Sequence, residues 1–296
     1  EDFMKDVTWL NNLKLRASYG ELNTTQNITD YGAQNVFSTT PYGGGIGTVL
    51  TLNTVGNENL RFEKALKSEI GLEAALFKNR LSFSTSYFND KRNNFIYSDN
   101  TTVGTAFTSF INAGDWTAKG YELELKGIIV STKNTNLSVY FNGAAFDRKV
   151  NKLNRPNDPN NQLLRGLTVN KVGYQPDEYY LVPYAGVDSA TGLATYTKLD
   201  GTTTSVYSAN DRVLTGKTPY AKYEGGFGLQ FSHKGFDIST DFVFKEGNYT
   251  YNYMWQNMNA DGQAPTRNQA VNAFDYWTPT NTDATRPAPR QISGVV

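Results

Sequence analysis

Apolar and polar residues alternate along several long stretches of the chain, most clearly between residues 66 and 87. One parity holds Leu66, Ser68, Ile70, Leu72, Ala74 and Leu76, and the other holds Lys67, Glu69, Gly71, Glu73 and Ala75. After a turn from Phe77 to Arg80, the alternation resumes through Leu81, Phe83, Thr85 and Tyr87. Because successive side chains of a strand point to opposite faces, this pattern predicts a β-hairpin with one mainly apolar face and one polar face.

The same period-two pattern predicts about seven long strands. They cover residues 13–19, 66–76, 81–87, 121–126, 137–145, 223–232 and 236–244. A strand in a soluble protein usually has about five to six residues. Strands of ten or more residues, as at 66–76 and 223–232, therefore favour a wall about as tall as a lipid bilayer.

Short and long connections alternate between these strands. The short ones are 77–80, 131–136 and 233–235, and the long ones are about 21–60, 98–114, 153–219 and everything from 247 onward. Tight turns at one end and long polar loops at the other are typical of an up-and-down outer-membrane barrel. We expect the connection from Leu153 to Pro219 to be a structureless loop, which is unusual in a compact soluble domain.

Composition agrees with a membrane barrel. Charged residues make up 19% of the chain, mean hydropathy is −0.52, and no apolar run is long enough for a membrane helix, so a spanning structure has to be a closed barrel. The 28 basic residues balance the 28 acidic ones, which removes nucleic acid as the default partner. The absence of cysteine excludes a disulfide scaffold and thiolate metal sites. No signal peptide is evident and the first residue is Glu1, so we expect a piece of a longer, processed chain.

Six segments follow one another along nearly the whole chain. The longest is GNENLRFEKALKSEIGLEAALFKNRLSFSTSYFNDKRNNFI, from Gly56 to Ile96, and the others are LKLRASYG, NAGDWTAKGYELEL, VGYQPDEYYLVPYAGVDSATG, DRVLTGKTPYAKYEGGFGLQFSHKGFDIST and FDYWTPTN. Taken together in this order, they resemble the SusC/RagA family of TonB-dependent outer-membrane transporters. The chain departs from the family pattern at Phe62, where the family often has Trp, and at Phe88-Asn89, which replaces part of a Tyr-Tyr pair.

The resemblance implies an all-β fold in which residues 1–296 form part of a transmembrane antiparallel up-and-down β-barrel. A single-chain bacterial barrel has an even number of strands, so seven strands are expected to be an incomplete part of a 22-stranded, plugged barrel. In the family, a plug domain with a TonB box precedes this region and further strands follow it. Both are expected to lie outside this chain.

The resemblance also implies a function and partners. The family imports nutrient oligomers, either glycan oligosaccharides or peptides, through the outer membrane of Gram-negative bacteria. TonB with ExbB and ExbD energises import, and a SusD-like surface lipoprotein forms a lid. Membrane lipid and lipopolysaccharide are expected to surround the barrel, and no cofactor is expected.

The sequence points to no catalytic or metal site. His233 is the only histidine and lies in a predicted tight turn, where a solvated side chain is expected. The pairs Glu122/Glu124 and Asp237/Asp241 each share a face, as glycosidase carboxylates would, but the wet inner wall of a barrel explains them too. Asp188 and Asp200 fit no EF-hand spacing, and Asx turns account for both.

Two sets of side chains are candidates for function. We expect the polar parity to line the lumen through Lys67, Glu73, Glu122, Glu124, Ser138, Asn142, Gln230, Asp237 and Asp241. Aromatic residues of the long loops can stack on sugar rings, pack against a lid or pack within the loops, and the sequence leaves these roles open. These residues are Tyr179, Tyr180, Tyr184, Tyr207, Tyr249, Tyr251, Tyr253, Trp255 and Trp277.

Aromatic residues near strand ends are predicted to form interfacial girdles, because their rings are apolar and their tips polar. This set comprises Trp9, Tyr87, Tyr97, Trp116 and Tyr223.

Two other classes of protein share the strand pattern: a passive outer-membrane porin or adhesin barrel, which lacks a plug and TonB box, and a secreted all-β carbohydrate-binding or hydrolytic domain. The secreted domain would be soluble without detergent and would bury positions such as Ile70, Leu72 and Phe83 between its sheets.

Overall fold

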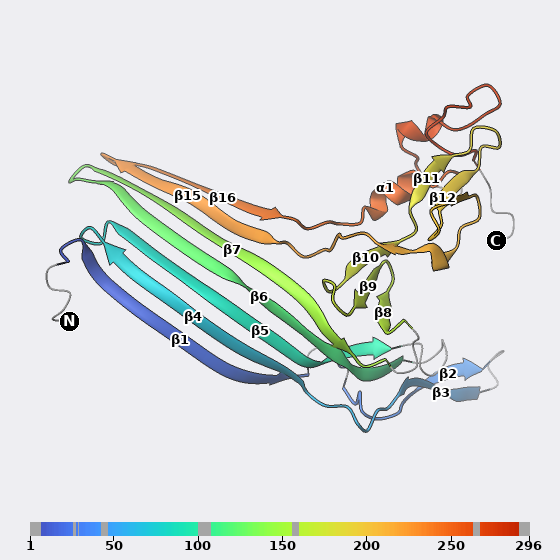
Figure 1. The fold of residues 1–296 in the computed structure, drawn as a ribbon, viewed down its shortest axis with the longest axis horizontal. Coiled ribbons are helices and arrows are strands. Elements are labelled where there is room, and N and C mark those ends of the chain that lie inside the picture. The colour runs from blue at the N-terminus through green and yellow to red at the C-terminus, as the bar shows by residue number, and fades with distance from the viewer. Residues whose placement is uncertain are drawn as a thin grey trace. The chain divides into compact units, whose positions relative to one another are not determined.

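A computed structural model describes residues 7–25, 28, 30–42, 47–99, 108–155, 160–262 and 267–289 of the protein (Figure 1). The chain divides into two compact units. The strand unit comprises Glu1–Leu163, Asn170–Pro176 and Tyr220–Asn248, and the loop unit comprises Leu164–Val169, Asp177–Pro219 and Tyr249–Val296.

The strand unit is built on long antiparallel strands that lie side by side (Figure 1). In chain order they are β1 (Leu10–Thr24), β4 (Glu63–Leu76), β5 (Leu81–Asp99), β6 (Thr108–Ser131), β7 (Thr135–Leu153), β15 (Tyr223–His233) and β16 (Phe236–Glu246). Neighbours in the chain are neighbours in the sheet, so the predicted all-β, up-and-down order of seven long strands is confirmed. Among the residues that the structure describes, β1 and β16 remain the two edges and no closed barrel forms.

Tight turns join the strands at one end of the sheet. The first turn uses left-handed backbone at Phe77, Lys78 and Asn79, with φ of 52°, 59° and 63°. It is held by the Phe77 amide, which donates to the Trp9 carbonyl at 2.8 Å. The turn between β15 and β16 uses Lys234 and Gly235, both with positive φ.

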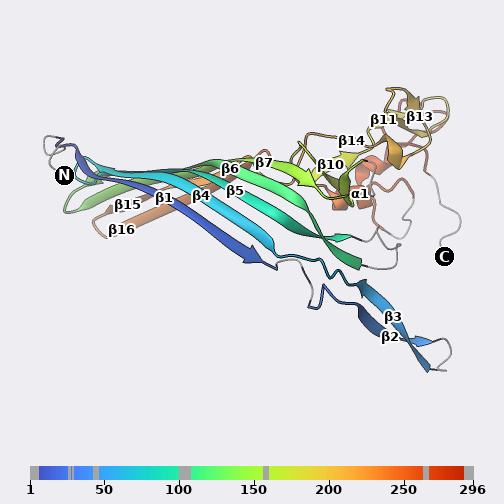
Figure 2. The ribbon, with the colours of Figure 1, turned by 60° about the horizontal axis from the view of Figure 1, so that its bottom comes forward.

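The long connections contain more regular structure than the sequence predicted. A hairpin of β2 (Val36–Tyr42) and β3 (Gly47–Val55) occupies the predicted loop 21–60 and lies beyond the ends of β1 and β4 (Figure 2). Strand β6 starts at Thr108, well inside the predicted loop 98–114. The prediction failed there because register shifts interrupt the β5–β6 pairing at Arg92, Phe95 and Ile96, so the period-two pattern breaks.

The predicted structureless loop from Leu153 to Pro219 is also wrong. Its short strands are β8 (Gln162–Arg165), β9 (Thr168–Lys171), β10 (Glu178–Leu181), β11 (Tyr184–Val187), β12 (Ala194–Thr197), β13 (Thr203–Thr204) and β14 (Val213–Leu214). In the loop unit, β10 pairs with β14 and with the first residues of β9, while β11, β12 and β13 form a separate sheet. Strands of two to four residues are too short to show a period in the sequence.

The rest of the loop unit follows Tyr249. It contains the helix α1 (Tyr253–Met258) and a 3₁₀ turn at Val271–Phe274, while a further 3₁₀ turn, Ala209–Asp211, lies between β13 and β14. The side chain of Asn252 caps α1 by accepting from the Trp255 amide at 2.8 Å. Within the described ranges, no helix is both long and apolar enough to cross a membrane.

A small core forms in the strand unit beside the long connections. Ala113, Val150, Leu153 and Leu163 are almost fully buried, and Phe95, Tyr97 and Ile111 pack against them. Tyr97 therefore does not belong to an interfacial girdle, and that prediction is wrong.

Polar contacts fix the same end of β4, β5 and β6. The buried carboxylate of Glu63 pairs with Arg92 at 2.7 Å. The amide side chain of Asn112 donates to the carbonyls of Arg61 and Asn94, and its oxygen accepts from the Arg61 amide at 2.8 Å. The NLRFEK and NAGDW segments therefore have a structural role. Their side chains join β4, β5 and β6 where the β5–β6 pairing is irregular.

Candidate functional site

The register of the long strands separates two faces. Residues directly opposed in antiparallel neighbours lie on the same face. Glu73 opposes Ser84, Ser84 opposes Glu124, and Glu124 opposes Asn142, so one row of polar side chains crosses β4 to β7. We call the face that carries this row the polar face, and the opposite side of the sheet the apolar face.

Every residue predicted to line a lumen falls on the polar face. Strand pairing places on this face Lys67, Glu73, Glu122, Glu124, Ser138, Asn142, Gln230, Asp237 and Asp241. The sequence missed Arg16 and Lys245, which the register adds to the same face as Glu122 and Glu224. The sequence shows that polar and apolar residues alternate around Arg16 and Lys245. Which residues of other strands lie beside them depends on how the strands pair.

The apolar face exposes large hydrophobic side chains from β1, β4, β6, β7, β15 and β16. Examples are Leu15 at 71% exposed, Tyr19 at 76% and Phe242 at 54%. Others on this face are Leu13, Ile70, Tyr121, Leu123, Val139, Tyr223, Phe227 and Ile238. The polar face exposes Leu22 and Val243 on the two edge strands and Ile128 beside a bulge. Contiguous exposed apolar surface on this scale is characteristic of a surface that contacts another apolar phase or a partner.

Ion pairs bridge neighbouring strands on the polar face. Arg16 contacts both Glu69 and Glu73 at 3.3 Å, Lys67 contacts Asp90 at 3.3 Å, and Lys245 contacts Glu224 at 3.3 Å. Each is partly exposed and is therefore worth about 0–1 kcal/mol to stability. Together they give the polar face both positive and negative side chains.

Glycines let long side chains lie flat on this wall. A Cβ added at Gly71 would stand 2.6 Å from Nε of Arg16, and one added at Gly228 would stand 2.7 Å from the Asp241 carboxylate. The Tyr140 ring also lies next to Gly228, and its hydroxyl donates to the Asp241 carboxylate at 2.5 Å. Gly71 and Gly228 thus leave room for side chains of the neighbouring strands.

Three hollows of the polar face are lined by described residues. The most voluminous of these three has a volume of about 640 Å³ and is lined mainly by Arg16, Glu122, Glu124, Glu224 and Lys245 together with Ser84, Ser86 and Asn142. A second of 390 Å³ lies between Arg16, Glu124 and Lys126, and a third of 350 Å³ is lined by Ser138, Gln230 and Asp237. Their donors, acceptors and charges suit a polar or ionic ligand.

The structure places the residues of the predicted girdle on both faces of the sheet. Tyr87 lies on the apolar face beside Tyr121, with ring centroids 5.1 Å apart, and Tyr223 lies in the same register row. Trp9, which is 53% exposed, precedes β1. Trp116 lies on the polar face, where the guanidinium of Arg92 sits 5.3 Å from its ring, so the prediction for Trp116 is wrong. Trp116 has the same parity along β6 as Glu122 and Glu124, and the prediction failed because it used only the position of Trp116 near a strand end.

All of the loop aromatics singled out in the sequence belong to the loop unit. Tyr184, Tyr207, Tyr249, Tyr253 and Trp255 are exposed, between 47% and 60%. The others are half-buried: Tyr179, Tyr180, Tyr251 and Trp277. The exposed rings are available to a ligand or partner, whereas the half-buried ones also hold the unit together.

Contacts of the half-buried rings show this second role. The Tyr179 hydroxyl donates to the Tyr249 carbonyl at 3.2 Å and accepts from the Tyr251 amide at 3.1 Å. Tyr251 packs against Tyr253 at 4.7 Å between ring centroids. Burial, followed by the nearby Tyr253, raises the pKa of Tyr251.

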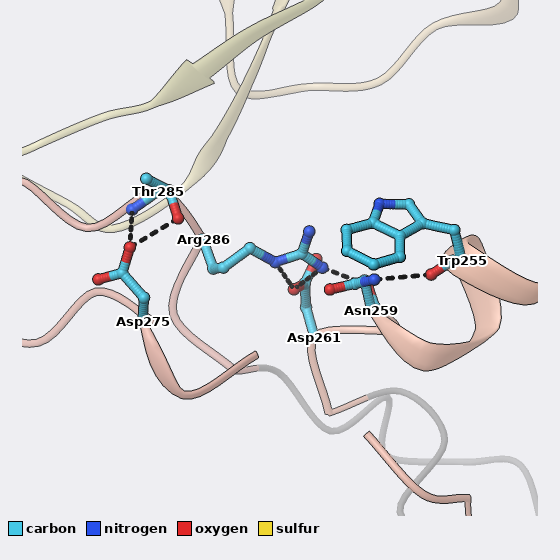
Figure 3. Close-up of polar contacts among 6 residues, drawn as sticks. All are labelled: Trp255, Asn259, Asp261, Asp275, Thr285 and Arg286. Carbon is cyan, nitrogen blue, oxygen red and sulfur yellow. Dashed lines mark hydrogen bonds and ion pairs between the residues drawn. The ribbon is translucent and has the colours of Figure 1, made fainter. Parts of the chain in front are cut away.

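A polar network ties the end of the described chain to α1 (Figure 3). Arg286 donates from Nε and Nη2 to Asp261 at 3.0 and 2.7 Å, and from Nη2 to the Asn259 carbonyl. Asn259 in turn donates from its side chain to the Trp255 carbonyl at 2.8 Å. Asp275 accepts from the amide and hydroxyl of Thr285 (Figure 3), and these hydrogen bonds lower the pKa of Asp275.

The remaining predicted residues are placed without a catalytic arrangement. His233 is exposed at the end of β15, where its Nδ1 hydrogen-bonds with the Thr135 hydroxyl at 2.8 Å. Asp188 accepts from the amides of Ala190 and Thr191, and Asp200 accepts from Thr202, as Asx turns do. Across the described part of the chain, no three His, Cys, Asp or Glu side chains gather as metal ligands would.

Comparison with known proteins gives the same assignment along the chain. Residues 6–187 match the family model described as TonB dependent receptor-like, beta-barrel. The chain is 28% identical to TonB-dependent receptor P3 of Formosa agariphila over 98% of its own length and 31% of that protein. It is 24% identical to TonB-dependent receptor SusC of Bacteroides thetaiotaomicron over 85% of its length and 26% of that protein.

Solved structures agree with the sequence comparisons. The structure of the RagAB peptide transporter matches with a TM-score of 0.82 and 26% identity, covering 97% of this chain and 32% of that one. The chain thus spans about a third of the length of the relatives that it matches. On the family match, the SusC and RagAB likenesses and the order of its strands, the chain belongs to the TonB-dependent receptor β-barrel family, in its SusC/RagA branch.

Proposed function

We propose that this chain forms part of the wall of an outer-membrane importer of nutrient oligomers in a Gram-negative bacterium. The observation that carries the proposal is the two-faced sheet, with exposed large apolar side chains on one face and predominantly polar and ionic side chains on the other. A lipid-facing exterior and a polar lumen need this division on every strand. The family match supports the same function.

The chain is proposed to be one part of a larger barrel. The edges of the sheet, β1 and β16, each present one row of backbone groups that no strand of the described residues pairs. Unpaired backbone groups inside a bilayer cost several kcal/mol each. Further strands would pair with these edges and a plug would fill the lumen, and the relatives are about three times as long as this chain, which leaves room for both.

The cargo is proposed to be an oligopeptide or a glycan oligosaccharide. A neighbour in structure is named as a peptide transporter, and a relative is SusC. The hollow of about 640 Å³ on the polar face offers carboxylates, a guanidinium, an ammonium and hydroxyls, which suit the amide or hydroxyl groups of such oligomers. The exposed rings of Tyr184, Tyr207, Tyr249, Tyr253 and Trp255 offer stacking surfaces to cargo or to a SusD-like lid.

Import is proposed to depend on TonB and a lid lipoprotein, with no catalytic step in the chain. The test uses the full-length protein in its host. Cells that carry it should take up labelled oligopeptides or oligosaccharides, and deletion of tonB should abolish uptake. Pull-down from detergent-solubilised outer membranes should recover a lipoprotein companion. Uptake that persists without TonB would support a passive porin and contradict the proposal.

A further inference from the structure

The apolar face changes character toward the long connections. On β5, β6 and β7, one row consists of Phe83, Leu125 and Phe141. Two rows further along lies the row of Tyr87, Tyr121 and Ala145. The next row is Asn89, Lys119 and Asp147. Apolar side chains thus give way to tyrosines and then to charges, as expected where a membrane meets water.

Three lysines gather directly beyond the tyrosines. Lys91 and Lys149 occupy one row on either side of Thr117, and Lys119 lies two residues along β6 from Thr117. All three are exposed. Lys119 contacts Asp147 at 3.5 Å. The side chains of Lys91 and Lys149 have no hydrogen bond or ion pair with any residue that the structure describes.

The surrounding charges leave the patch positive. On the same face, Lys64 is paired with Glu21 at 2.8 Å, and Asp147 faces Lys119. Asp115, two residues from Thr117 along β6, accepts from the Asn94 amide at 2.9 Å and forms no ion pair with a described residue. Lys91 and Lys149 are therefore the two lysines of the patch without an ion pair to a described residue, and the three lysines outnumber Asp115 and Asp147. Two strand spacings of ~4.8 Å place the Cβ atoms of these two lysines roughly 10 Å apart, so flexible ammonium groups can converge on one anion.

We propose that Lys91, Lys119 and Lys149 bind the phosphate of a phosphorylated glycolipid in the outer leaflet of the membrane. This inference rests on the proposed function, because it takes the apolar face as lipid-facing and the long connections as extracellular. Continuity with the exposed apolar rows favours a lipid, since acyl chains would cover those rows while the headgroup reaches the lysines. A free phosphate would gain nothing from the apolar rows.

The test compares lipid binding by the purified full-length protein in detergent. The probe is fluorescent lipid A in its phosphorylated form, with dephosphorylated lipid A as the second arm. At about 1 kcal/mol for each lysine near a membrane surface, the double variant K91Q/K149Q should bind the phosphorylated lipid about thirtyfold more weakly. The matched control K78Q/K133Q removes two exposed lysines of the short turns, at the other end of the strands, and should bind as the wild type does.

Several outcomes overturn the lipid site. Unchanged binding by K91Q/K149Q, equal binding of dephosphorylated lipid A, or full competition by millimolar inorganic phosphate would each contradict it. Uptake of labelled cargo by the same variants separates the two proposals. TonB-dependent import with unaltered lipid binding would overturn only the lipid site, whereas absent import with phosphate-dependent lipid binding would overturn only the importer.

Discussion

The indole ring of Trp277 lies over Gly192, so closely that a Cβ added at Gly192 would collide with the ring. The same indole donates from Nε1 to the Ser189 carbonyl at 2.8 Å. The Ala288 amide donates to the Gly192 carbonyl at 2.9 Å. These contacts join the GVDSATG segment to the FDYWTPTN segment within the loop unit. They give Trp277 a packing role there, besides any contact with a ligand.

Replacing Gly192 by alanine should displace Trp277 and loosen the end of the loop unit. Overpacking costs about 1–3 kcal/mol, and the left-handed backbone at Gly192, with φ of 68°, adds strain. Limited proteolysis of the purified full-length protein should cut segment 267–289 faster in Gly192→Ala.

Gly216→Ala is the matched control for this experiment. Gly216 has nearly the same φ, 70°, but a Cβ there would meet nothing within 4 Å. It therefore reports the cost of the backbone alone. Equal proteolysis of the two variants would show that the ring contact contributes nothing.

Arg286→Ala should release the same segment from α1. The substitution removes the bonds to Asp261 and to the Asn259 carbonyl, and a loss of about 1–3 kcal/mol is expected from groups left without partners. Hydrogen exchange of α1 should rise, and combining the variant with Asp261→Asn should cost less than the sum of the two. Arg267→Ala, which removes only an exposed bond to Asn257, serves as control. Strict additivity would contradict the network.

Acid should weaken the turn around Asp275. Hydrogen bonds from Thr285 hold the pKa of Asp275 below its ordinary value of about 3.9, so their stabilisation is complete above that pH and is lost as pH falls through the folded pKa. Pepsin cleavage near Phe274 should therefore increase below about pH 4. In Thr285→Val the increase should begin at higher pH, because the hydroxyl bond at 2.6 Å is missing. Thr280→Val should behave as the wild type, and an identical pH profile for Thr285→Val would refute the assignment.

Glycines of the wall should differ in their tolerance of alanine. At Gly120 the added Cβ meets the backbone carbonyl of Ala145, which cannot move cheaply, whereas at Gly71 it meets the flexible Arg16 side chain. At Gly127 it meets only ordinary contacts at 3.6 Å. Thermal unfolding in detergent should therefore rank Gly120→Ala as the most destabilised, by about 2–3 kcal/mol, then Gly71→Ala, then Gly127→Ala near zero. A reversed order would contradict the register.

The sequence predicted the long strands well because each carries an uninterrupted period of two. Strands β4 and β5 match the predicted alternation from Leu66 to Tyr87 almost residue by residue. Predictions failed where the period is interrupted or too short. The bulges near Phe95 hid the start of β6, and the short strands β8 to β14 have no readable period.

The sequence predicted which face of its strand each candidate residue occupies, but not which residues of different strands lie together. Alternation assigns Glu122 and Glu124 to one face, yet only pairing across strands brings Arg16 and Lys245 to that same face. Likewise, no local sequence pattern predicts that Trp277 covers Gly192 or that Lys91 and Lys149 flank Thr117. Such relationships depend on contacts between distant segments.

The most direct test of a lipid-facing apolar face and a wet polar face follows neighbouring residues along β6. The chain has no cysteine. Spin labels can therefore be placed singly from Tyr121 to Lys126 in the full-length protein, with any cysteine elsewhere replaced, and reconstituted in lipid nanodiscs. Labels at 121, 123 and 125 should be accessible to lipid-soluble oxygen, and labels at 122, 124 and 126 to a water-soluble nickel complex, in opposite phase. Equal accessibility at Leu123 and Glu124, or the reverse phase, would contradict the account.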